Sequence, residues 1–440
     1  MLRTAIITLL SFVTLTAVAI DIDTAPIDSF ISHIERNNQG IGTVMIAHKD
    51  TIIYNRDFGK HTVAPDNGNY RIGSITKLFT ATIIHNLCSE NKLSLNTTLH
   101  NFFPQIPASD LITIQQLLSH TSGLADYTIK QDTLPLWLTT PATQQEIMNE
   151  IVRQDTIFTP GTALRYSNTA YYLLGSIIEQ IYHKTYSEVV DSLIIKPLHL
   201  NNTQSGIADP SAAATPYKLN TANRWQAVED FYFPNVTAVG DIISSPTDLI
   251  TFIQALFNGN LVDNNALQLM IPQDDQPFGC GMMIMPFYEH TFYGHAGDTY
   301  GTNTAIMYNQ QDSITIAICI NGCSTSRNDL LIGICSAIYD SYYEFPDFSD
   351  LQQYTAPVDE LKQYAGIFTS DIINLPMHIE FDPTDNNLSL RLQGQPAIWL
   401  QAKAPGIFVN TMTGVGIAFK DKDHLTFRQF QTLIRLTRQQ

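Results

Sequence analysis

The sequence contains few charged residues, and few of those are basic. Only 15% of its 440 residues are Asp, Glu, Lys or Arg, and 24 basic residues stand against 41 acidic ones, so the net charge is −17. No Lys/Arg-rich run interrupts this excess. A surface of that sign repels nucleic acid and anionic lipid. We therefore expect no nucleic-acid partner and no binding to an acidic membrane surface.

Cysteine is also scarce, and its spacing shows no pattern. The five cysteines are Cys88, Cys280, Cys319, Cys323 and Cys335. None forms a Cys-x-x-Cys pair or a cluster with histidine, so we predict no metal site and no cofactor. An odd number leaves at least one thiol free or paired between chains in an oxidising compartment. Most of the cysteines are expected to be small core residues.

The N-terminal apolar stretch is too short to span a membrane. It follows Arg3, runs from Ala5 to Ile20 and contains Ala17-Val18-Ala19 near its end. A spanning helix needs about 20 apolar residues. A basic start, an apolar middle and a small-x-small ending are instead typical of a secretory signal peptide. We predict a signal peptide over residues 1–19 and export to the periplasm or the medium, with no stable membrane span after cleavage. An uncleaved anchor is the alternative.

The rest of the chain has the composition of a folded protein with a large core, since 44% of its residues are hydrophobic. Residues 42–58 form a hairpin pattern, and a helical stripe begins at Ile75. Further helical patterns fill the middle of the chain. Several strand patterns and a helix then follow, up to residue 340. This order predicts an α/β (α+β) fold with an antiparallel sheet flanked by helices and a helical subdomain.

The last hundred residues have a different pattern. Residues 342–358 are acidic, polar and contain proline, which is typical of a linker. Eight short strand-like runs follow, separated by turn residues, and predict a small C-terminal all-β barrel. The expected organisation is therefore a signal peptide (1–19), a hydrolase domain (24–341), a linker (342–358) and a barrel (359–440).

Two Ser-x-x-Lys motifs occur in the sequence. Residues three apart share one face of a helix, so a neutral lysine amine can take the proton of the serine if burial lowers its pKa. Ser74 and Lys77 lie at the start of an apolar helical stripe. Ser89 and Lys92 lie in a polar stretch at a helix end, and we interpret them as solvated residues. About one such motif is expected by chance in this composition, so the spacing alone decides nothing.

Two further motifs occur once each. Tyr166 and Asn168 form a Tyr-x-Asn just before an apolar helix, where Asn168 is either the helix N-cap or a substrate-binding amide. His295 and Gly297 form a His-x-Gly at the end of a strand pattern, followed by Asp298. Here the alternatives are an ordinary turn histidine and a site where glycine lets the substrate approach the backbone.

In this order, Ser-x-x-Lys, Tyr-x-Asn and His-x-Gly resemble the serine β-lactamase and penicillin-binding protein superfamily. The match is nearest to the class C-like group of D,D-peptidases, D-aminopeptidases and esterases. The strings LLSHTSGL, KPLHLNNT and SPTDLITFIQALFNG also fit this group. The resemblance covers about residues 25–340. The segment LKQYAGIF and the strands after it are similar to a lipocalin-like domain that some members carry.

The resemblance implies a role for each motif residue. Ser74 would be the acylated nucleophile, Lys77 its general base, and Tyr166 the relay of a proton to the leaving group. Asn168 would bind the substrate amide. The backbone N–H groups of Ser74 and Asp298 would form the oxyanion hole.

The third motif departs from the family pattern. His295 would stand where typical β-lactamases have lysine, beside Gly297. Position 296 is alanine and lacks the usual hydroxyl, and Asp298 adds a negative charge. Recognition of a substrate carboxylate is therefore expected to be poor.

The sequence thus predicts an exported serine hydrolase that cleaves small esters or D-amino-acid amides and peptides. Its partner would be a small molecule or a peptide, with cell-wall fragments among the candidates. The alternatives are a catalytically weak penicillin- or peptidoglycan-binding protein and a D,D-carboxypeptidase or β-lactamase proper. An α/β-hydrolase is not expected, because no Gly-x-Ser-x-Gly occurs. The natural substrate, the oligomeric state, the disulfide pairing and the role of the C-terminal domain stay open.

Overall fold

The computed structural model describes most of the chain after the N-terminal apolar stretch. The described residues are 22–63, 67–129, 138–219, 224–273, 276–348, 354, 356–370, 376–383, 386–392, 397–410, 415–429 and 432–439. The predicted signal peptide lies outside them, as does part of the predicted linker. Within the described part of the chain, no helix combines the length and the apolar character that a membrane crossing requires.

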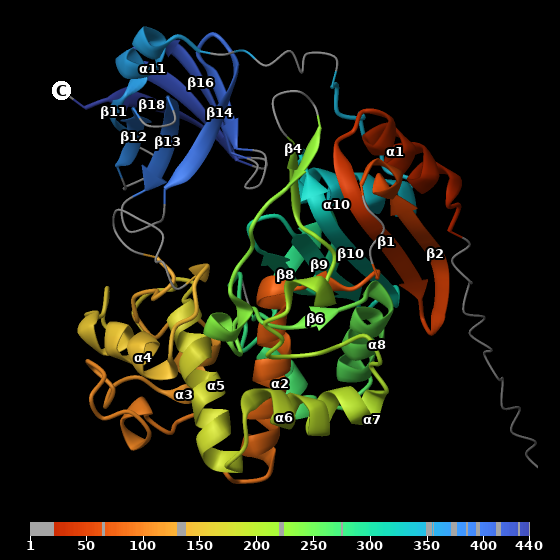
Figure 1. Cartoon of the computed structure of the whole chain (residues 1–440), viewed down its shortest axis with the longest axis vertical. Coiled ribbons are helices and arrows are strands. Elements are labelled where there is room, and N and C mark those ends of the chain that lie inside the picture. The colour runs from red at the N-terminus through yellow and green to blue at the C-terminus, as the bar shows by residue number, and fades with distance from the viewer. Residues whose placement is uncertain are drawn as a thin grey trace, which may run out of the picture.

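A large antiparallel sheet forms the centre of the larger domain (Figure 1). Its strand order is β2-β1-β10-β9-β8-β7, and every neighbouring pair on this path is antiparallel. The bounds are β1 (Gly40–His48), β2 (Thr51–Phe58), β7 (Met283–Phe287), β8 (His290–Asp298), β9 (Asn303–Asn309) and β10 (Ile314–Cys323). The N-terminal hairpin therefore pairs with a much later strand, from Gly40 opposite Cys323 to His48 opposite Ile314, and a local sequence pattern contains no sign of this pairing.

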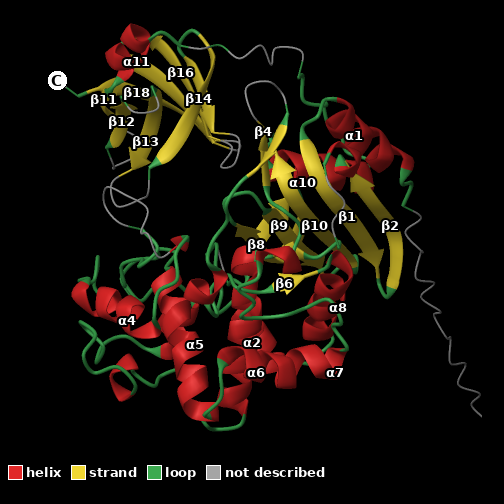
Figure 2. Cartoon of the chain, viewed as in Figure 1, coloured by secondary structure: helices red, strands yellow, loops and turns green. Residues whose placement is uncertain are grey.

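Helices cover both faces of this sheet (Figure 2). On one face, α1 (Ala25–Arg36) and α10 (Arg327–Ile338) pack in one apolar cluster with β1, β2 and β10. On the other face, α2 (Thr76–Ser89) and α8 (Pro246–Phe257) belong to a larger cluster that extends into the helical region. This second cluster includes buried residues of α2 itself, so the predicted nucleophile helix runs through the core.

The helical region lies beside α2. It consists of α3 (Ile114–Leu118), α4 (Gln144–Arg153), α5 (Asn168–Tyr182), α6 (Tyr186–Val190), α7 (Lys196–Leu198) and α9 (Asn264–Met270). β4 (Tyr217–Leu219) and β5 (Trp225–Ala227) extend the main sheet, since β4 pairs in parallel with β10 and antiparallel with β5. A separate small sheet pairs β3 (Tyr70–Arg71) with β6 (Ile243–Ser244). α5 packs directly against α2, which brings the Tyr-x-Asn motif to the Ser-x-x-Lys motif.

Eight strands close into a barrel in the C-terminal part of the chain (Figure 1). They are β11 (Gly366–Thr369), β12 (Met377–Asp382), β13 (Asn387–Leu392), β14 (Ile398–Ala404), β15 (Ile407–Asn410), β16 (Val415–Asp421), β17 (His424–Gln429) and β18 (Thr432–Arg438), preceded by α11 (Val358–Tyr364). Apolar side chains, among them Phe368, Phe408 and Phe427, form a core in its interior. The predicted fold, an antiparallel sheet flanked by helices plus a small all-β barrel, is confirmed.

Candidate active site

The predicted nucleophile, Ser74, lies on a tight turn rather than inside the helix. Residues Gly73–Ile75 form one turn of 3₁₀ helix, and α2 begins at Thr76. Gly73 has φ = +51°, and a Cβ at this position would lie 2.8 Å from the backbone nitrogen of Asp298. Only glycine tolerates both conditions. The turn that contains Ser74 therefore packs against the end of β8, and Ser74 itself is half-buried.

Lys77 is fully buried beneath this serine. Its Nζ lies 3.0 Å from Ser74 Oγ and donates to the backbone oxygen of Val239 at 2.9 Å. The rings of Tyr166 and Tyr171 lie 5.0 and 5.6 Å from Nζ. Burial lowers the pKa of Lys77 to about 7, although the Asp126 carboxylate acts in the opposite direction. A large share of this amine is therefore neutral at neutral pH, as a proton acceptor must be.

Tyr166 closes the same site from the start of α5. Burial raises the pKa of its phenol, whereas the nearby Ser74 hydroxyl lowers it. The hydroxyl is buried and has no well-formed hydrogen bond among the described residues. A buried phenol without a partner costs free energy unless a ligand supplies the missing bond. Tyr166 is therefore placed to exchange a proton with a group that enters beside Ser74.

His120 supports Tyr166, a role that the sequence motifs do not predict. Its ring stacks on Tyr166 at 4.2 Å between centroids, and its Nδ1 accepts from the backbone nitrogen of Ser167 at 3.2 Å. Burial lowers the pKa of His120 well below its usual value, so the ring is neutral. Phe278 lies 5.0 Å from His120 and 5.6 Å from Tyr166. The string LLSHTSGL was the available signal, but nothing in it shows that His120 contacts Tyr166.

Asn168 is not the N-cap of α5. Ser167 takes that role, because its side chain accepts from the backbone nitrogen of Ala170. The Asn168 side chain instead donates from Nδ2 to Asp126 Oδ2 at 3.0 Å and to Thr128 Oγ1 at 3.1 Å. Asp126 and Thr128 therefore hold the amide nitrogen of Asn168.

His295 lies on β8 with 3% of its surface exposed. Its ring is 6.2 Å from that of Tyr166. Burial, with a contribution from Lys77, lowers the pKa of His295 to about 3. Its Nδ1 lies 2.5 Å from the oxygen of Ala296, which can only accept, so Nδ1 carries the hydrogen and Nε2 is an acceptor. Unlike a lysine at this place, His295 supplies no positive charge at neutral pH.

The end of β8 lies directly against the nucleophile turn. A Cβ on Gly297 would lie 1.9 Å from the backbone oxygen of Ile72. The Asp298 carboxylate accepts from Asn303 Nδ2 at 2.7 Å and forms an ion pair with Arg327 of α10. Its charge is therefore compensated. This pairing reduces the repulsion between Asp298 and a substrate carboxylate. The lack of a cation at His295 is therefore the stronger reason to expect poor binding of a substrate carboxylate.

The loop that carries Val239 is fixed by a buried carboxylate. Asp241 accepts from Ser205 Oγ at 2.6 Å and from the backbone nitrogens of Gly206 and Ala238 at 2.9 and 2.8 Å. Ala238 has φ = +65°, a conformation that costs a residue with a Cβ about 1–2 kcal/mol. Hydrogen bonds to Asp241 thus hold a strained loop in place, and this loop presents the Val239 oxygen to Lys77.

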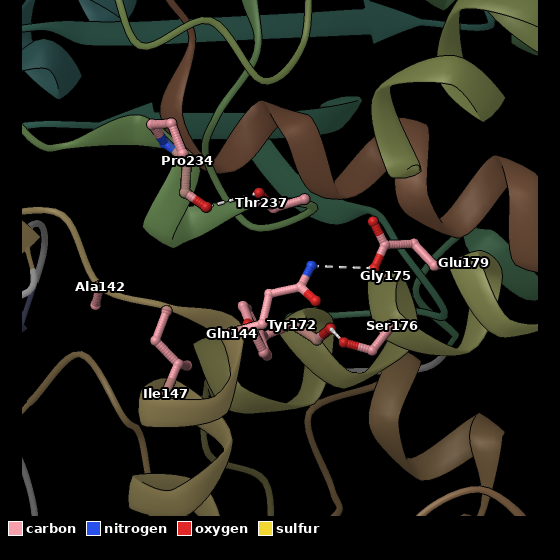
Figure 3. A pocket seen from close by; sticks show the side chains of 9 residues that line it. All are labelled: Ala142, Gln144, Ile147, Tyr172, Gly175, Ser176, Glu179, Pro234 and Thr237. Carbon is pink, nitrogen blue, oxygen red and sulfur yellow. Dashed lines mark hydrogen bonds between the residues drawn. The ribbon is translucent and has the colours of Figure 1, made fainter. Parts of the chain in front are cut away.

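A separate pocket lies between α4, α5 and the turn at residues 234–237 (Figure 3). Gln144 and Glu179 form a 3.4 Å hydrogen bond across it. None of the motif residues lines this pocket. No group of three or more His, Cys, Asp or Glu side chains in the described part of the chain is arranged to hold a metal ion. The motif residues around Ser74 therefore remain the candidate site.

A serine that contacts a buried lysine, with a tyrosine and the end of a strand beside it, is the arrangement of the penicillin-recognising serine enzymes. The model of the family described as Beta-lactamase matches residues 27–331. The chain therefore belongs to the β-lactamase family. The predicted resemblance is confirmed.

Individual relatives are about one-quarter identical to the chain over the segments that match. "Protein flp" of Staphylococcus aureus is 27% identical over 192 residues, which cover 40% of this chain and 37% of flp. The matched part is thus less than half of that relative. Among solved structures, a D-stereospecific amidohydrolase from Streptomyces has a TM-score of 0.62 and 24% identity, and the match covers 72% of this chain and 98% of that one. This likeness shows a shared fold.

One solved structure matches both domains. The octameric penicillin-binding protein homologue from Pyrococcus abyssi has a TM-score of 0.62 and 22% identity, over 94% of this chain and 99% of that one. The hydrolase fold and the barrel therefore occur together in another protein.

Proposed function

We propose that the protein is an exported serine hydrolase that forms an acyl-enzyme on Ser74 and cleaves small esters or amides and peptides of D-amino acids. The observation that carries this proposal is the 3.0 Å contact between Ser74 Oγ and the Nζ of a fully buried Lys77, whose pKa is lowered to about 7. A serine becomes a nucleophile only when a base stands ready to take its proton.

Acylation begins when neutral Lys77 takes the Ser74 proton. The serine oxygen attacks the substrate carbonyl carbon and forms a tetrahedral intermediate. The backbone N–H groups of Ser74 and Asp298, on two segments in direct contact, donate to its negative oxygen. The hydrogen bond to Val239 orients the amine, so that its lone pair can face the serine.

Tyr166 completes the proton transfer. Its phenol gives a proton to the leaving oxygen or nitrogen when the bond to the carbonyl carbon breaks, and it regains one from protonated Lys77. Water then attacks the ester on Ser74, and the same groups act in reverse to release the acid. The Tyr166 hydroxyl lies beside Ser74 with no well-formed hydrogen bond among the described residues, which supports this role.

The charges of the site favour substrates without a carboxylate near the cleaved bond. His295 is neutral, Ala296 has no hydroxyl, and Arg327 is engaged by Asp298. The expected order of kcat/KM places a D-alanine anilide and a short-chain nitrophenyl ester above nitrocefin and a D-alanyl-D-alanine peptide. The fold shared with a D-stereospecific amidohydrolase supports the choice of D-amino-acid substrates. If nitrocefin or the carboxylate-bearing peptide ranked first, this preference would be wrong.

Labelling of the mature protein with a fluorophosphonate, followed by mass mapping of the adduct, tests the nucleophile. We expect the adduct on Ser74 and its complete loss in Ser74→Ala. Ser89→Ala is the matched control, because Ser89 begins the second Ser-x-x-Lys motif and donates to Asp263 on the surface. Loss of labelling in the control with retention in Ser74→Ala would contradict the proposal.

A further inference from the structure

Asn168 can present either a hydrogen-bond donor or a hydrogen-bond acceptor to a substrate, and its residue type does not decide which. An asparagine side chain offers two donor hydrogens on Nδ2 and an acceptor on Oδ1. Which of them a substrate meets depends on what the protein has already bound. Here the protein binds the nitrogen, because Nδ2 donates to both Asp126 Oδ2 and Thr128 Oγ1.

The opposite orientation of the amide is excluded by charge. A carboxylate can only accept, so a flipped amide would place Oδ1 against Asp126, lose the hydrogen bond to that carboxylate and bring two acceptors together. Asp126 is itself held firmly. Its Oδ1 accepts from the backbone nitrogen and the hydroxyl of Thr128, at 2.9 and 2.7 Å, and its Oδ2 also accepts from the backbone nitrogen of Asn168 at 3.1 Å. The orientation of Asn168 is therefore built into the loop at residues 126–128.

The Oδ1 of Asn168 is left to the substrate. Asn168 is half-buried, and this oxygen accepts no hydrogen bond from any described residue and is not enclosed. Two further groups of the site also lack a fixed positive charge, since Lys77, which contacts Ser74, is largely neutral and His295 is neutral with Nε2 as an acceptor. The three motifs thus contribute acceptors, and no fixed cation, to the site.

The charge behind Asn168 is negative. The Asp126 carboxylate acts on the pKa of both Lys77 and Arg165, in the raising direction. Arg165 is half-buried and offsets part of this charge. Arg327, a cation on the His295 side of the site, is paired with Asp298. A positively charged donor on the substrate would therefore be favoured here, and an anion disfavoured.

We infer that Asn168, locked by Asp126 and Thr128, binds the free amine of an α-amino acyl substrate through Oδ1. This inference rests on the proposed function and narrows its substrate class to amides, peptides or esters whose acyl part carries an unblocked amine. Asp126 is the positioning residue that sets the orientation of the amide and adds a negative charge. The amine would lie one carbon from the carbonyl that Ser74 attacks.

The matched substrates are alanine p-nitroanilide, as both enantiomers, and propionyl p-nitroanilide, which differs only by lacking the amine. For the parent enzyme we expect kcat/KM for at least one alanine enantiomer to exceed that for the propionyl compound by about tenfold or more, because a site built to bind a donor rejects the analogue that lacks it. A ratio of one or below for both enantiomers overturns the inference.

Asp126→Asn tests the positioning role. It removes the charge and lets the Asn168 amide turn, so we expect the amine-to-propionyl ratio to fall to within about threefold of unity, whatever happens to the absolute rates. Thr128→Val removes only one of the two hydrogen-bond partners of the Asn168 nitrogen, so it should lower the amine-to-propionyl ratio less. This variant provides a second measurement if Asp126→Asn folds poorly. Asp110→Asn, on an exposed residue, is the matched control and should keep the parent ratio.

A ratio in Asp126→Asn and Thr128→Val equal to that of the parent overturns the positioning role. Hydrolysis of p-nitrophenyl propionate, which has no amine, separates this failure from that of the proposed function. Turnover of this ester through Ser74 without an amine preference refutes the inference alone. Absence of both ester turnover and Ser74 labelling in the parent refutes both.

Discussion

A serine, a lysine three residues later and a tyrosine ring near the lysine occur at both ends of α2. At its start are Ser74 and Lys77, and the ring of Tyr166 lies 5.0 Å from the Lys77 Nζ. At its end are Ser89 and Lys92, and the ring of Tyr182 lies 5.3 Å from the Lys92 Nζ. Tyr166 lies two residues before the start of α5, and Tyr182 is the last residue of α5, which packs against α2.

The surroundings of the two lysines are opposite. Lys77 has no exposed surface, and burial lowers its pKa to about 7. The Lys92 side chain is 51% exposed, and its hydrogen bond to Glu90 raises its pKa. The Ser89 hydroxyl donates to Asp263, and among the described residues no hydrogen bond joins it to Lys92. Spacing brings a serine and a lysine together, but burial decides whether the lysine is a base.

The largest expected effect separates the two lysines. Lys77→Ala should slow acylation of Ser74 by about 100- to 10,000-fold, the usual contribution of a positioned acid–base group. Lys92→Ala should leave the rate within about threefold of the parent. Stopped-flow labelling with a fluorescent penicillin or a chromogenic ester, with circular dichroism as the check on folding, measures both. Equal effects of the two substitutions would break the comparison.

The two tyrosines should differ in the same sense. Tyr166→Phe removes the buried hydroxyl beside Ser74 and should slow turnover by about 100-fold or more. Tyr182→Phe removes a hydroxyl that also lacks a partner among the described residues, but at the other end of α2. We expect no change in turnover from it. Steady-state kinetics on an ester and an anilide decide this, and an unimpaired Tyr166→Phe enzyme would refute the relay.

The pH dependence should report the lowered pKa of Lys77. Only the neutral amine accepts a proton, so kcat/KM for an uncharged ester should rise about tenfold per unit below pH 7 and level off above it. His295, with its pKa near 3, and Tyr166, whose pKa is raised, titrate outside this range. A profile that rises only near the usual lysine pKa of 10.5 would show that burial does not create the base.

The smallest expected effect concerns the charge beside the predicted oxyanion hole. Arg327→Gln leaves the Asp298 carboxylate without its cation, and the unpaired charge should slow ester turnover by about 3- to 10-fold. The matched second change, Asp298→Asn in the same chain, should restore most of the rate. If the double variant were as slow as Arg327→Gln alone, the ion pair would act on structure rather than on the transition state.

The C-terminal barrel and the hairpin were the most predictable parts of the fold. Alternating apolar residues and turn residues indicate short strands locally, and all eight predicted runs are strands of the closed barrel. Other elements went unpredicted, among them α1, α4 and the pair of β4 with β5. The two residues of β3 gain their conformation only by pairing with β6, about 170 residues away. A local pattern contains no such information.

By itself, the sequence determined which residue types occur at helical spacing and in what order along the chain. This was enough to predict the family, the antiparallel sheet with its helices, and the positions of Ser74, Lys77, Tyr166, Asn168 and His295 as candidates. It also indicated which Ser-x-x-Lys belongs to an apolar helix.

Only the tertiary structure decided the state of each group. It buried Lys77 under α5 and placed the Val239 oxygen on its amine. It paired Asp298 with Arg327 and turned the Asn168 nitrogen toward Asp126. Protonation and hydrogen-bond polarity depend on which groups lie within a few ångströms and on how much water is excluded. These neighbours come from segments far apart in the sequence, so their effect exists only after the chain has folded.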